Sequence, residues 1–299
     1  MKTQTTKIST EQKIAGQLIK AMESGQLAWR KPWTLASGRQ QNLVTGNCYH
    51  AGNFALTEII SACYGWPPFW LTFNGGRANG LKLTKGEKAT YISKPVMLTK
   101  DEEQEDGTIA KSGFTIFKTV AIFNVAQFEQ CEKLDRMIMN RTAKNGLVNL
   151  TEPERIEAAE NILTAWEVPV RFGGDKAAYS PVEDKIYMPE RKQFENASGL
   201  YSTWAHECIH STGHKKRLGR DMSGMFGSES YAKEELIAEL GSVIACSRLQ
   251  IGYEIENHAS YLQSWIKVLK ESPKFVMTAL RQATNAANLL IPETEIAND

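Results

Sequence analysis

The spacing of apolar residues predicts both a helix and strands in the first half of the chain. Residues 8–24 place apolar side chains at positions 14, 15, 18, 19 and 22, which is the spacing of one helix face. Ser9 followed three residues later by Gln12 fits a capping box at the start of that helix. Residues 88–98 and 113–123 predict two strands of a long hairpin, whose acidic loop sequence DEEQED we expect to be solvated.

The middle of the chain carries a change of pattern that we interpret as a domain boundary. Residues 29–80 are rich in Trp, Gly and Asn and predict loops that join short elements. Residues 128–152 combine mixed charge with weak periodicity, which is typical of a boundary. Thr151 as a cap and Pro153 in the first turn then predict a new helix over 151–166.

The second half alternates short strands with longer helices, which is typical of an α+β fold. The pattern predicts strands over 168–172 and 184–188, and helices over 199–213, 230–249, 257–271 and 273–289. The sequence thus predicts two α+β domains: a basic domain over 1–130 and a second domain over 151–299, joined by a linker over 131–150.

The composition is that of a folded chain without a membrane segment. Its 299 residues are 42% hydrophobic, which is enough to bury substantial cores. No apolar run approaches the roughly 18 residues of a membrane span, and residues 1–13 lack an apolar signal core, so we expect a cytoplasmic protein. The five cysteines are widely spaced without a CxxC pair, which argues against a disulfide framework and against a zinc site built from cysteines.

The net charge of +1 conceals an uneven distribution of charge along the chain. Residues 1–100 carry 13 Lys or Arg and 4 Asp or Glu, whereas residues 131–299 carry 20 basic and 24 acidic residues. A polyanionic partner is therefore expected for the first domain alone.

The strongest chemical signal is the sequence His206-Glu207-Cys208-Ile209-His210 within a predicted helix. Four residues make about one helical turn, so His206 and His210 project from one face and can bind one metal ion. Glu207 is then placed to take a proton from a water molecule at an open coordination position and to pass it to a leaving amine. The alternative is a helix with two surface histidines and an exposed glutamate.

A third ligand is available on the next predicted helix. Glu235 and Glu239 lie four residues apart and share a face, whereas Glu234 points about 100° away. Gluzincin peptidases combine H-E-x-x-H with a Glu on a later helix, followed four residues on by a residue that supports a ligand histidine. We assign Glu235 as the ligand and Glu239 as the support, and the reverse assignment stays open. Two histidines and one carboxylate suit Zn²⁺ best, while Mn²⁺ or Co²⁺ could use the same set.

His214 is a competing third ligand, but its position is unfavourable. It follows Gly213 directly, whereas metzincins place their third histidine three residues after a turn glycine. We expect His214 to bond local carbonyl groups or to support a ligand from behind. Residues 179–189 predict a hairpin, which is either an edge strand that pairs with an extended peptide or a plain cover for the helices.

Aromatic and basic residues are interleaved over 29–91, the combination that single-stranded nucleic acid requires. Bases stack on the rings, while Lys and Arg neutralise phosphates. The alternative is that most of these rings belong to the core and the charges to the surface. The residues that we select as a DNA-binding group are Trp29, Lys31, Trp33, Tyr49, Lys85 and Lys88.

Several motifs in one order resemble the ArdC antirestriction family of conjugative plasmids, over nearly the whole chain. The front half is similar to the single-stranded-DNA-binding domain of that family through Trp29-Arg-Lys-Pro-Trp33, Trp70-Leu-Thr-Phe73 and Lys85-Gly-Glu-Lys88. The back half resembles its zincin-like domain through His206-Glu-Cys-Ile-His210-Ser-Thr-Gly-His214 and Glu234-Glu-Leu-Ile-Ala-Glu239.

The resemblance implies a plasmid-encoded protein that binds single-stranded DNA and protects incoming conjugative DNA from host restriction. It also implies metal-dependent peptide hydrolysis, with the host restriction complex or another protein as the candidate partner. Two other functions stay open. One is a zinc peptidase recruited to DNA to cleave DNA-bound proteins, and the other is a non-catalytic single-strand-binding or replication accessory protein.

Overall fold

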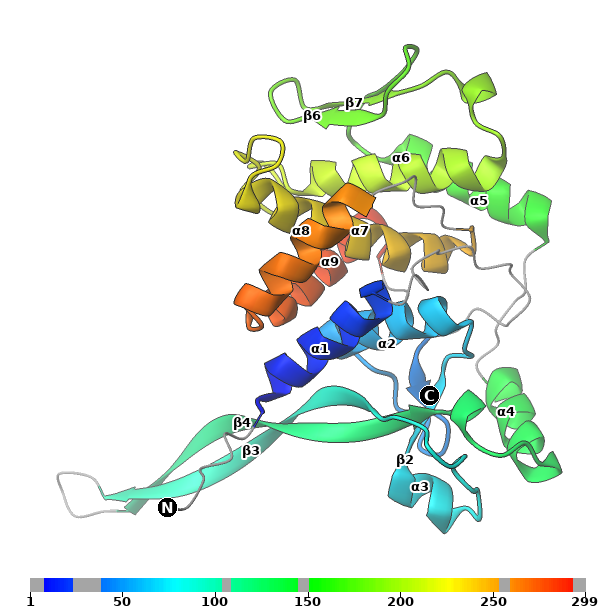
Figure 1. Ribbon diagram of the computed structural model, residues 1–299, viewed down its shortest axis with the longest axis vertical. Coiled ribbons are helices and arrows are strands. Elements are labelled where there is room, and N and C mark those ends of the chain that lie inside the picture. Colours follow the sequence, from blue (N-terminus) through cyan, green and yellow to red (C-terminus); the bar gives the residue numbers. More distant parts are fainter. Residues whose placement is uncertain (1–7, 24–38, 104–108, 145–150, 253–258, 293–299) are drawn as a thin grey trace.

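The computed structural model describes residues 8–23, 39–103, 109–144, 151–252 and 259–292 (Figure 1). A four-stranded sheet, a body of helices and a three-stranded sheet lie one above the other. The first sheet has the strand order β1-β2-β4-β3 and the second the order β5-β7-β6. This mixture of sheets and separate helices confirms the predicted α+β class.

The elements of the second half lie close to their predicted positions. The helices are α1 (Thr10–Glu23), α2 (Ala51–Tyr64), α3 (Phe73–Ala78), α4 (Glu132–Lys144), α5 (Glu152–Ala165), α6 (Ala197–Thr212), α7 (Glu229–Leu249), α8 (Ala259–Glu271) and α9 (Phe275–Leu290). The strands are β1 (Gln41–Asn42), β2 (Phe69–Thr72), β3 (Thr90–Glu103), β4 (Ile109–Asn124), β5 (Val170–Phe172), β6 (Ala178–Ser180) and β7 (Lys185–Met188). Short 3₁₀ turns cover Val125–Gln127 and Arg191–Gln193.

Helix α1 begins and packs as its sequence predicts. The backbone N–H of Ser9 donates to Gln12 Oε1 at 2.8 Å, and Ser9 Oγ accepts from the N–H of Gln12 at 3.2 Å, so the capping box is confirmed. The helix packs into the main core and contacts β3, α8 and α9. Its buried apolar residues are Ile14, Ala15, Leu18, Ile19 and Met22.

Helix α2 lies where the sequence predicts loops, so that prediction is wrong for Ala51–Tyr64. Residues 54–61 are buried without interruption. A helix buried on every side lacks the polar stripe from which a 3.6-residue period is recognised. Gly65 ends the helix in the left-handed conformation at φ +65°, which favours glycine.

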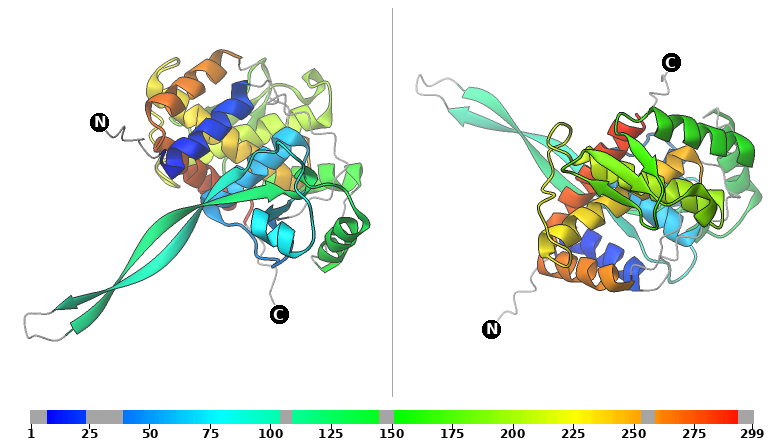
Figure 2. Two further views of the ribbon diagram at one scale, coloured as in Figure 1. Left: turned by 60° about the horizontal axis from the view of Figure 1, so that its bottom comes forward. Right: turned by 90° about the horizontal axis from the view of Figure 1, so that it is seen from above.

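Strands β3 and β4 form the long hairpin that the sequence predicts, and they are longer than predicted. They pair antiparallel from Thr90 opposite Ile122 to Glu103 opposite Ile109. Their outer part projects from the body of the molecule as a two-stranded ribbon (Figures 1 and 2). The acidic run at 101–106 lies partly at the end of β3 and partly outside the described residues, so its solvation stays a prediction.

One main core joins the two halves of the chain. It includes Leu18 of α1, Leu56 of α2 and Trp70 of β2 together with Trp204 of α6 and Leu280 of α9. The sequence predicts a separate core for each domain, whereas α1 and α2 pack directly on the helices of the second half. A division of the chain into two functional domains stays a prediction.

The segment predicted as a linker, 131–150, contains helix α4. Leu134 is fully buried in a smaller core that it shares with residues of β2 and β4. Arg141 Nη2 donates to the carbonyl oxygen of Leu43 at 3.1 Å, which fixes the far end of α4 to the first half. Helix α4 is therefore packed against the first half and is not a free spacer, while residues 145–150 lie outside the described part of the chain.

Among the described strands, β6 forms the edge of the second sheet that lies next to helix α6. Strand β5 runs parallel to β7, and β6 pairs antiparallel with β7, which confirms the hairpin predicted over 179–189. Strand β6 lies at the edge of this sheet and contacts α6.

Helix α5 also starts as predicted, because the N–H of Thr151 donates to Glu154 Oε2 at 2.7 Å in a capping box.

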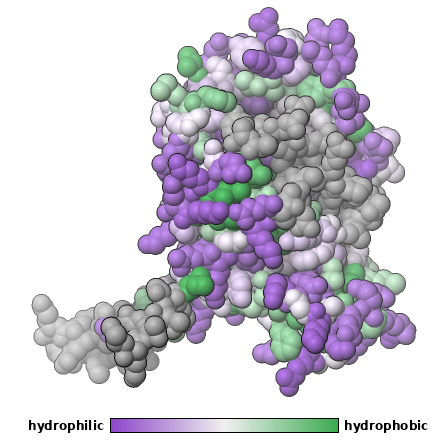
Figure 3. All heavy atoms as spheres, viewed as in Figure 1, coloured by the Kyte–Doolittle hydropathy of each residue, from purple (hydrophilic) through white to green (hydrophobic). Residues whose placement is uncertain are grey.

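The face of the molecule seen in Figure 3 is mostly hydrophilic, with hydrophobic residues in small patches. Within the described residues, no helix combines the length and the apolar character needed to cross a bilayer. Large apolar side chains that are mostly exposed include Met97, Phe117, Val182, Met225 and Phe226.

Replacing Ile14 with alanine should destabilise the whole chain, because α1 helps to fill a core that it shares with α8 and α9. Ile14 is 1% exposed, and truncation of a buried isoleucine to alanine costs about 2–5 kcal/mol of unfolding free energy. Urea unfolding followed by fluorescence and circular dichroism measures the change. Ile8→Ala is the matched control, because Ile8 is 61% exposed just before the same helix. Equal stability of the two variants would contradict the shared core.

Candidate metal centre

Helices α6 and α7 carry the predicted site residues and lie against each other. Asn196 caps α6 by accepting a hydrogen bond from the N–H of Gly199 at 2.8 Å, and Ser228 caps α7 by accepting from the N–H of Tyr231 at 3.2 Å. A Cβ atom at Gly241 of α7 would lie 2.8 Å from Ile209 Cγ2 of α6. Glycine at this position therefore allows the two helices to approach closely.

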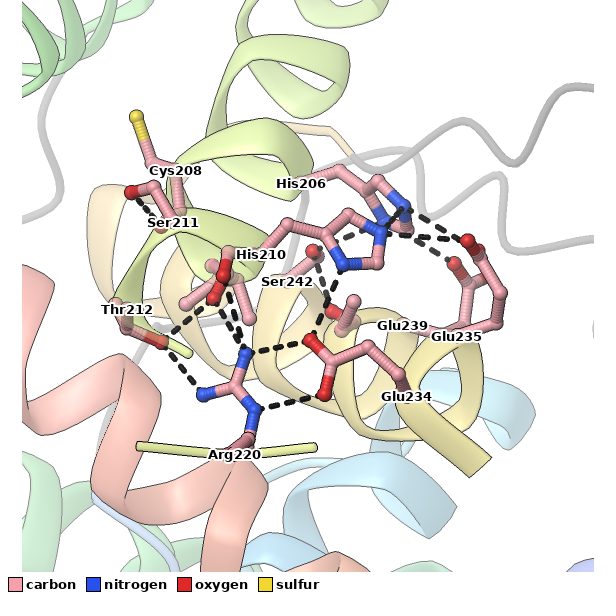
Figure 4. A network of polar contacts seen from close by, with 12 residues as sticks. His206, Cys208, His210, Ser211, Thr212, Arg220, Glu234, Glu235, Glu239 and Ser242 are labelled. Atoms are coloured by element: carbon pink, nitrogen blue, oxygen red, sulfur yellow. Dashed lines mark hydrogen bonds and ion pairs between the residues drawn. The ribbon is translucent and has the colours of Figure 1, made fainter. Parts of the chain in front are cut away.

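Three side chains from these helices converge on one point (Figure 4). His206 Nε2 lies 3.0 Å from His210 Nε2. The Glu235 carboxylate faces both rings, with Oε2 3.7 Å from His206 Nε2 and Oε1 3.5 Å from His210 Nε2. The structure thus brings together the two histidines and the glutamate that the sequence selects as a ligand set.

The opposite nitrogen of each histidine ring faces a carboxylate. His206 Nδ1 lies 3.5 Å from Glu239 Oε2, and Ser242 Oγ is 3.4 Å from the same nitrogen. His210 Nδ1 lies 3.2 Å from Glu234 Oε1. These contacts orient the two rings so that both Nε2 atoms point toward Glu235.

Arg220 holds Glu234 in place and was not selected from the sequence. Its guanidinium donates to both carboxylate oxygens of Glu234, at 2.7 and 2.8 Å, and to Thr212 Oγ1 at 2.7 Å and the Ile209 carbonyl at 2.8 Å. The Arg220 side chain is only 3% exposed. Glu234 was missed because helical geometry turns it away from Glu235, and its partner Arg220 comes from the loop between α6 and α7, which has no periodic pattern.

Burial and neighbouring charges shift the pKa values of the site residues. Burial opposes charge on His210, but hydrogen bonds with Glu234 and Glu235 outweigh it and raise its pKa well above the usual value. Burial likewise disfavours charge on Glu235, yet the two histidines hold its pKa well below the usual range. Burial opposes charge on His206, but the bond with Glu235 together with the negative charges of Glu207 and Glu239 raises its pKa.

A cavity of about 830 Å³ opens beside these three donors. Strand β6 lines it through Ala178 and Tyr179, and the start of α7 lines it through Tyr231. Glu207 also lines the cavity and is 7% exposed, so the predicted base lies next to both histidines. The Glu207 carboxylate and the edge strand β6 therefore line the same cavity.

His214 is not one of the three converging donors and instead contacts Asp184 in the turn between β6 and β7. Its Nδ1 accepts from the N–H of Lys216 at 3.2 Å and faces Asp184 Oδ2 at 3.7 Å. Asp184 is bound by Arg217 and accepts from the Tyr179 hydroxyl at 2.7 Å. The bond from Arg217 holds the pKa of Asp184 well below its usual range. The contacts of His214 thus support the hairpin that borders the cavity.

The residues selected for DNA binding are only partly described. Trp29, Lys31 and Trp33 lie outside the described residues. Tyr49 is half-buried against the main core, and burial raises its pKa despite a hydrogen bond with Asn42. The two lysines of the set, Lys85 and Lys88, are exposed. Their role in DNA binding stays a prediction.

The chemistry of the donor set fits a divalent cation. Two imidazole nitrogens and a carboxylate converge, and the far side of each imidazole is fixed by another carboxylate. Four buried carboxylates, those of Glu207, Glu234, Glu235 and Glu239, surround the two histidines, and Arg220 neutralises only the one to which it is bound. The excess negative charge favours a cation between the donors.

The fold and the three converging donors are those of a zincin-like domain. The family model described as zincin-like metallopeptidase matches residues 157–282, which include all three donors. The family model described as the N-terminal domain of anti-restriction factor ArdC matches residues 9–125. A zincin-like domain implies a divalent metal ion.

Solved structures of one protein match the whole arrangement. The metal-free structure of the antirestriction protein ArdC from plasmid R388 is 30% identical, with a TM-score of 0.66, and 94% of this chain and 96% of that chain are covered. The Mn(II)-bound structure of that protein is 28% identical with a TM-score of 0.61. The chain belongs to the ArdC antirestriction family.

In two further relatives the matching segment is part of a much longer chain. Two DNA primases named TraC from Escherichia coli are 32% identical over 290 residues and 34% identical over 283 residues. These alignments cover 94% and 90% of this chain but 27% and 19% of the primases, so the chain spans a minor part of their length. The protein y4eC of Sinorhizobium fredii is 28% identical, with 96% of this chain and 93% of that protein covered.

Replacing Glu234 with alanine should weaken divalent metal binding about 10- to 100-fold, because His210 loses the carboxylate that orients its ring. Titration calorimetry with Mn²⁺ measures the affinity, and circular dichroism checks that the variant is folded. Glu229→Ala is the control on the same helix, because Glu229 is exposed and forms an ion pair with Lys233, away from the histidines. An unchanged affinity in a folded Glu234→Ala variant would show that the ring is oriented by other contacts.

Replacing Asp184 with asparagine should reduce stability at neutral pH by on the order of 2 kcal/mol, because the charged bonds with Arg217 are lost. Asparagine tolerates the left-handed backbone of this residue, at φ +50°. Because the folded-state pKa of Asp184 is lowered, its contribution is present above about pH 4 and is lost as the pH falls further.

Urea unfolding at several pH values measures this difference between the wild type and Asp184→Asn. Asp135→Asn is the control, since Asp135 is an exposed aspartate on α4. A stability gap that stays constant down to low pH would contradict the charged interaction.

Proposed function

We propose that this chain is a plasmid-encoded antirestriction protein that binds single-stranded DNA and protects incoming conjugative DNA from host restriction. Similarity to ArdC over 96% of that protein supports this function. The observation that carries the proposal is the convergence of His206, His210 and Glu235 within a chain that also matches the ArdC N-terminal domain. Its place of action is the cytoplasm, where incoming DNA meets restriction enzymes.

The metal-holding residues are His206, His210 and Glu235, with Glu239 and Glu234 behind the two imidazoles. Two nitrogen donors and one oxygen donor suit Zn²⁺ best, while Mn²⁺ or Co²⁺ could use the same set. The Mn(II)-bound structure of R388 ArdC supports a divalent ion in this class of site. When bound, the metal supplies Lewis-acid polarisation of a peptide carbonyl.

The protein's own groups perform the remaining steps of a peptide hydrolysis. Glu207, beside both histidines on the cavity wall, accepts a proton from the attacking water and returns it to the leaving amine. Strand β6 is the edge strand of its sheet among the described strands and lines the cavity, so an extended peptide can pair with it and be held across the cavity. The candidate protein partners are the host restriction complex and proteins bound to the incoming strand.

Replacing Glu207 with glutamine should abolish peptide hydrolysis while leaving metal affinity unchanged, because the side chain keeps its size but no longer accepts a proton. The decisive measurement is conjugative transfer of unmodified plasmid into restricting and non-restricting recipients. We expect the variant to lower transfer into the restricting recipient relative to the wild type. Transfer into the non-restricting recipient should be unchanged.

Glu195→Gln is the matched control for that assay, since Glu195 is an exposed glutamate just before α6. Protection that survives in the Glu207→Gln variant would assign the antirestriction effect to binding alone. Loss of transfer in both recipients would instead indicate a general defect.

A second candidate function is that of a replication accessory protein that binds single strands without hydrolysis. The similarity to two TraC primases favours it, because there the same segment accompanies a primase. This function predicts a defect in plasmid replication whether or not the host carries a restriction system. The replication function would be excluded if plasmids with and without the gene for this protein became established equally well in a non-restricting host.

A further inference from the structure

The β3–β4 ribbon is anchored to the body at its inner end and extends beyond it. Asn53 of α2 holds the strand there, donating to the Ser93 carbonyl at 2.7 Å and accepting from the Ser93 N–H at 3.0 Å. Thr10 of α1 bonds to Thr119 on the partner strand. Beyond these anchors, residues 94–100 and 112–118 continue outward in register (Figures 1 and 2).

The projecting part exposes large apolar side chains that its own pairing cannot cover. Met97 is 77% exposed, Phe117 67%, Phe114 46% and Leu98 36%. Among the described residues, no sheet or helix packs behind this outer part of the ribbon, and an isolated two-stranded ribbon is only marginally stable. Exposed apolar side chains gathered on such an element are typical of a binding surface.

The two faces of the ribbon differ in charge. Side chains alternate between faces, so the register places Lys94, Lys118, Leu98, Phe114 and Lys100 on one face. Lys94 stands directly opposite Lys118, and both are exposed. Like charges opposite each other destabilise a strand pair unless an anion neutralises them.

Over residues 94–100 and 113–118, the opposite face carries no cation. Its outward positions are Pro95, Met97 and Thr99 on β3, opposite Phe117 and Thr115 on β4. In sequence, 94–100 and 112–118 contain three lysines and no acidic residue. Over this stretch the lysine face therefore combines positive charge with an exposed ring, while the other face offers apolar area. The acidic run at 101–106 begins beyond it.

We propose that the lysine face of the β3–β4 ribbon binds single-stranded DNA, an inference that rests on the proposed DNA-binding function. Phe114 lies between the Lys94–Lys118 pair and Lys100 along this face. A base can stack on the ring while the phosphates on either side contact the lysines. A single strand fits this surface better than a duplex, because a ring reaches the flat face of a base only where the bases are unpaired.

The first test changes the charge of the lysine face. Lys94→Gln/Lys118→Gln is compared with Lys20→Gln/Lys144→Gln, which removes two exposed lysines from the body of the protein. Binding of a fluorescein-labelled oligodeoxythymidylate to the full chain is measured by anisotropy at several salt concentrations. Removing two phosphate contacts should reduce the slope of log affinity against log salt by about 1.4, and the body variant should keep the wild-type slope.

The second test uses the two phenylalanines on opposite faces. Phe114→Ala should weaken binding of the same oligonucleotide about tenfold, and Phe114→Leu should weaken it similarly, because leucine keeps apolar area but not the stacking ring. Phe117→Ala is the control on the other face and should leave the affinity nearly unchanged. Circular dichroism verifies that each variant is folded.

The outcomes separate this inference from the proposed function. Failure of the wild-type chain to bind the oligonucleotide would overturn the DNA-binding function itself. Tight binding by the wild type with equal binding by all ribbon variants would overturn the ribbon inference alone. A wild-type dimer that Phe114→Ala or Phe117→Ala turns into a monomer would assign the ribbon to a second copy of the chain instead.

Discussion

The burial of opposite charges between α6 and α7 is the constraint on which the site depends. One helix contributes two histidines and the other contributes three carboxylates. His210 and the three carboxylates are buried, and the His206 side chain is 16% exposed. A charge in such a place persists only when a partner of opposite sign lies within contact distance. Gly241 makes those distances possible, because any larger residue would meet Ile209 and hold the helices apart. Packing and electrostatics therefore act on the same pair of helices.

Other parts of the fold maintain this arrangement from outside. Arg220 links the loop before α7 to the end of α6 through Thr212 and the Ile209 carbonyl, so the loop cannot move without releasing Glu234. On the opposite side, Glu58 of α2 accepts bonds from Gln40 at 2.9 Å and from Ser247 of α7. The helix that carries the metal-site carboxylates is thus bonded directly to the first half of the chain.

Sequence reasoning identified the elements with a clear period or a local signature. The H-E-x-x-H spacing located His206 and His210, and the four-residue interval located Glu235 and Glu239, because helical geometry alone fixes those relations. It failed for α2, whose buried residues leave no polar stripe, and for Glu234 and Arg220, whose partnership joins a helix to an aperiodic loop. Such contacts depend on tertiary packing, which no local pattern records. The extent of the β3–β4 ribbon was also underestimated, since pairing beyond the body depends on the partner strand rather than on alternating burial.

The shared core has a consequence for how this protein is inherited. Because α1 and α2 fill space against α7, α8 and α9, neither half would keep its apolar surface covered after separation. Recombination within the segment would break a single folded unit, so genetic exchange should carry it whole. The alignments with the TraC primases agree, since they run through both halves in one stretch of 290 residues within much longer chains. The two segments that separate family models match thus share one core and lie together in the TraC alignments.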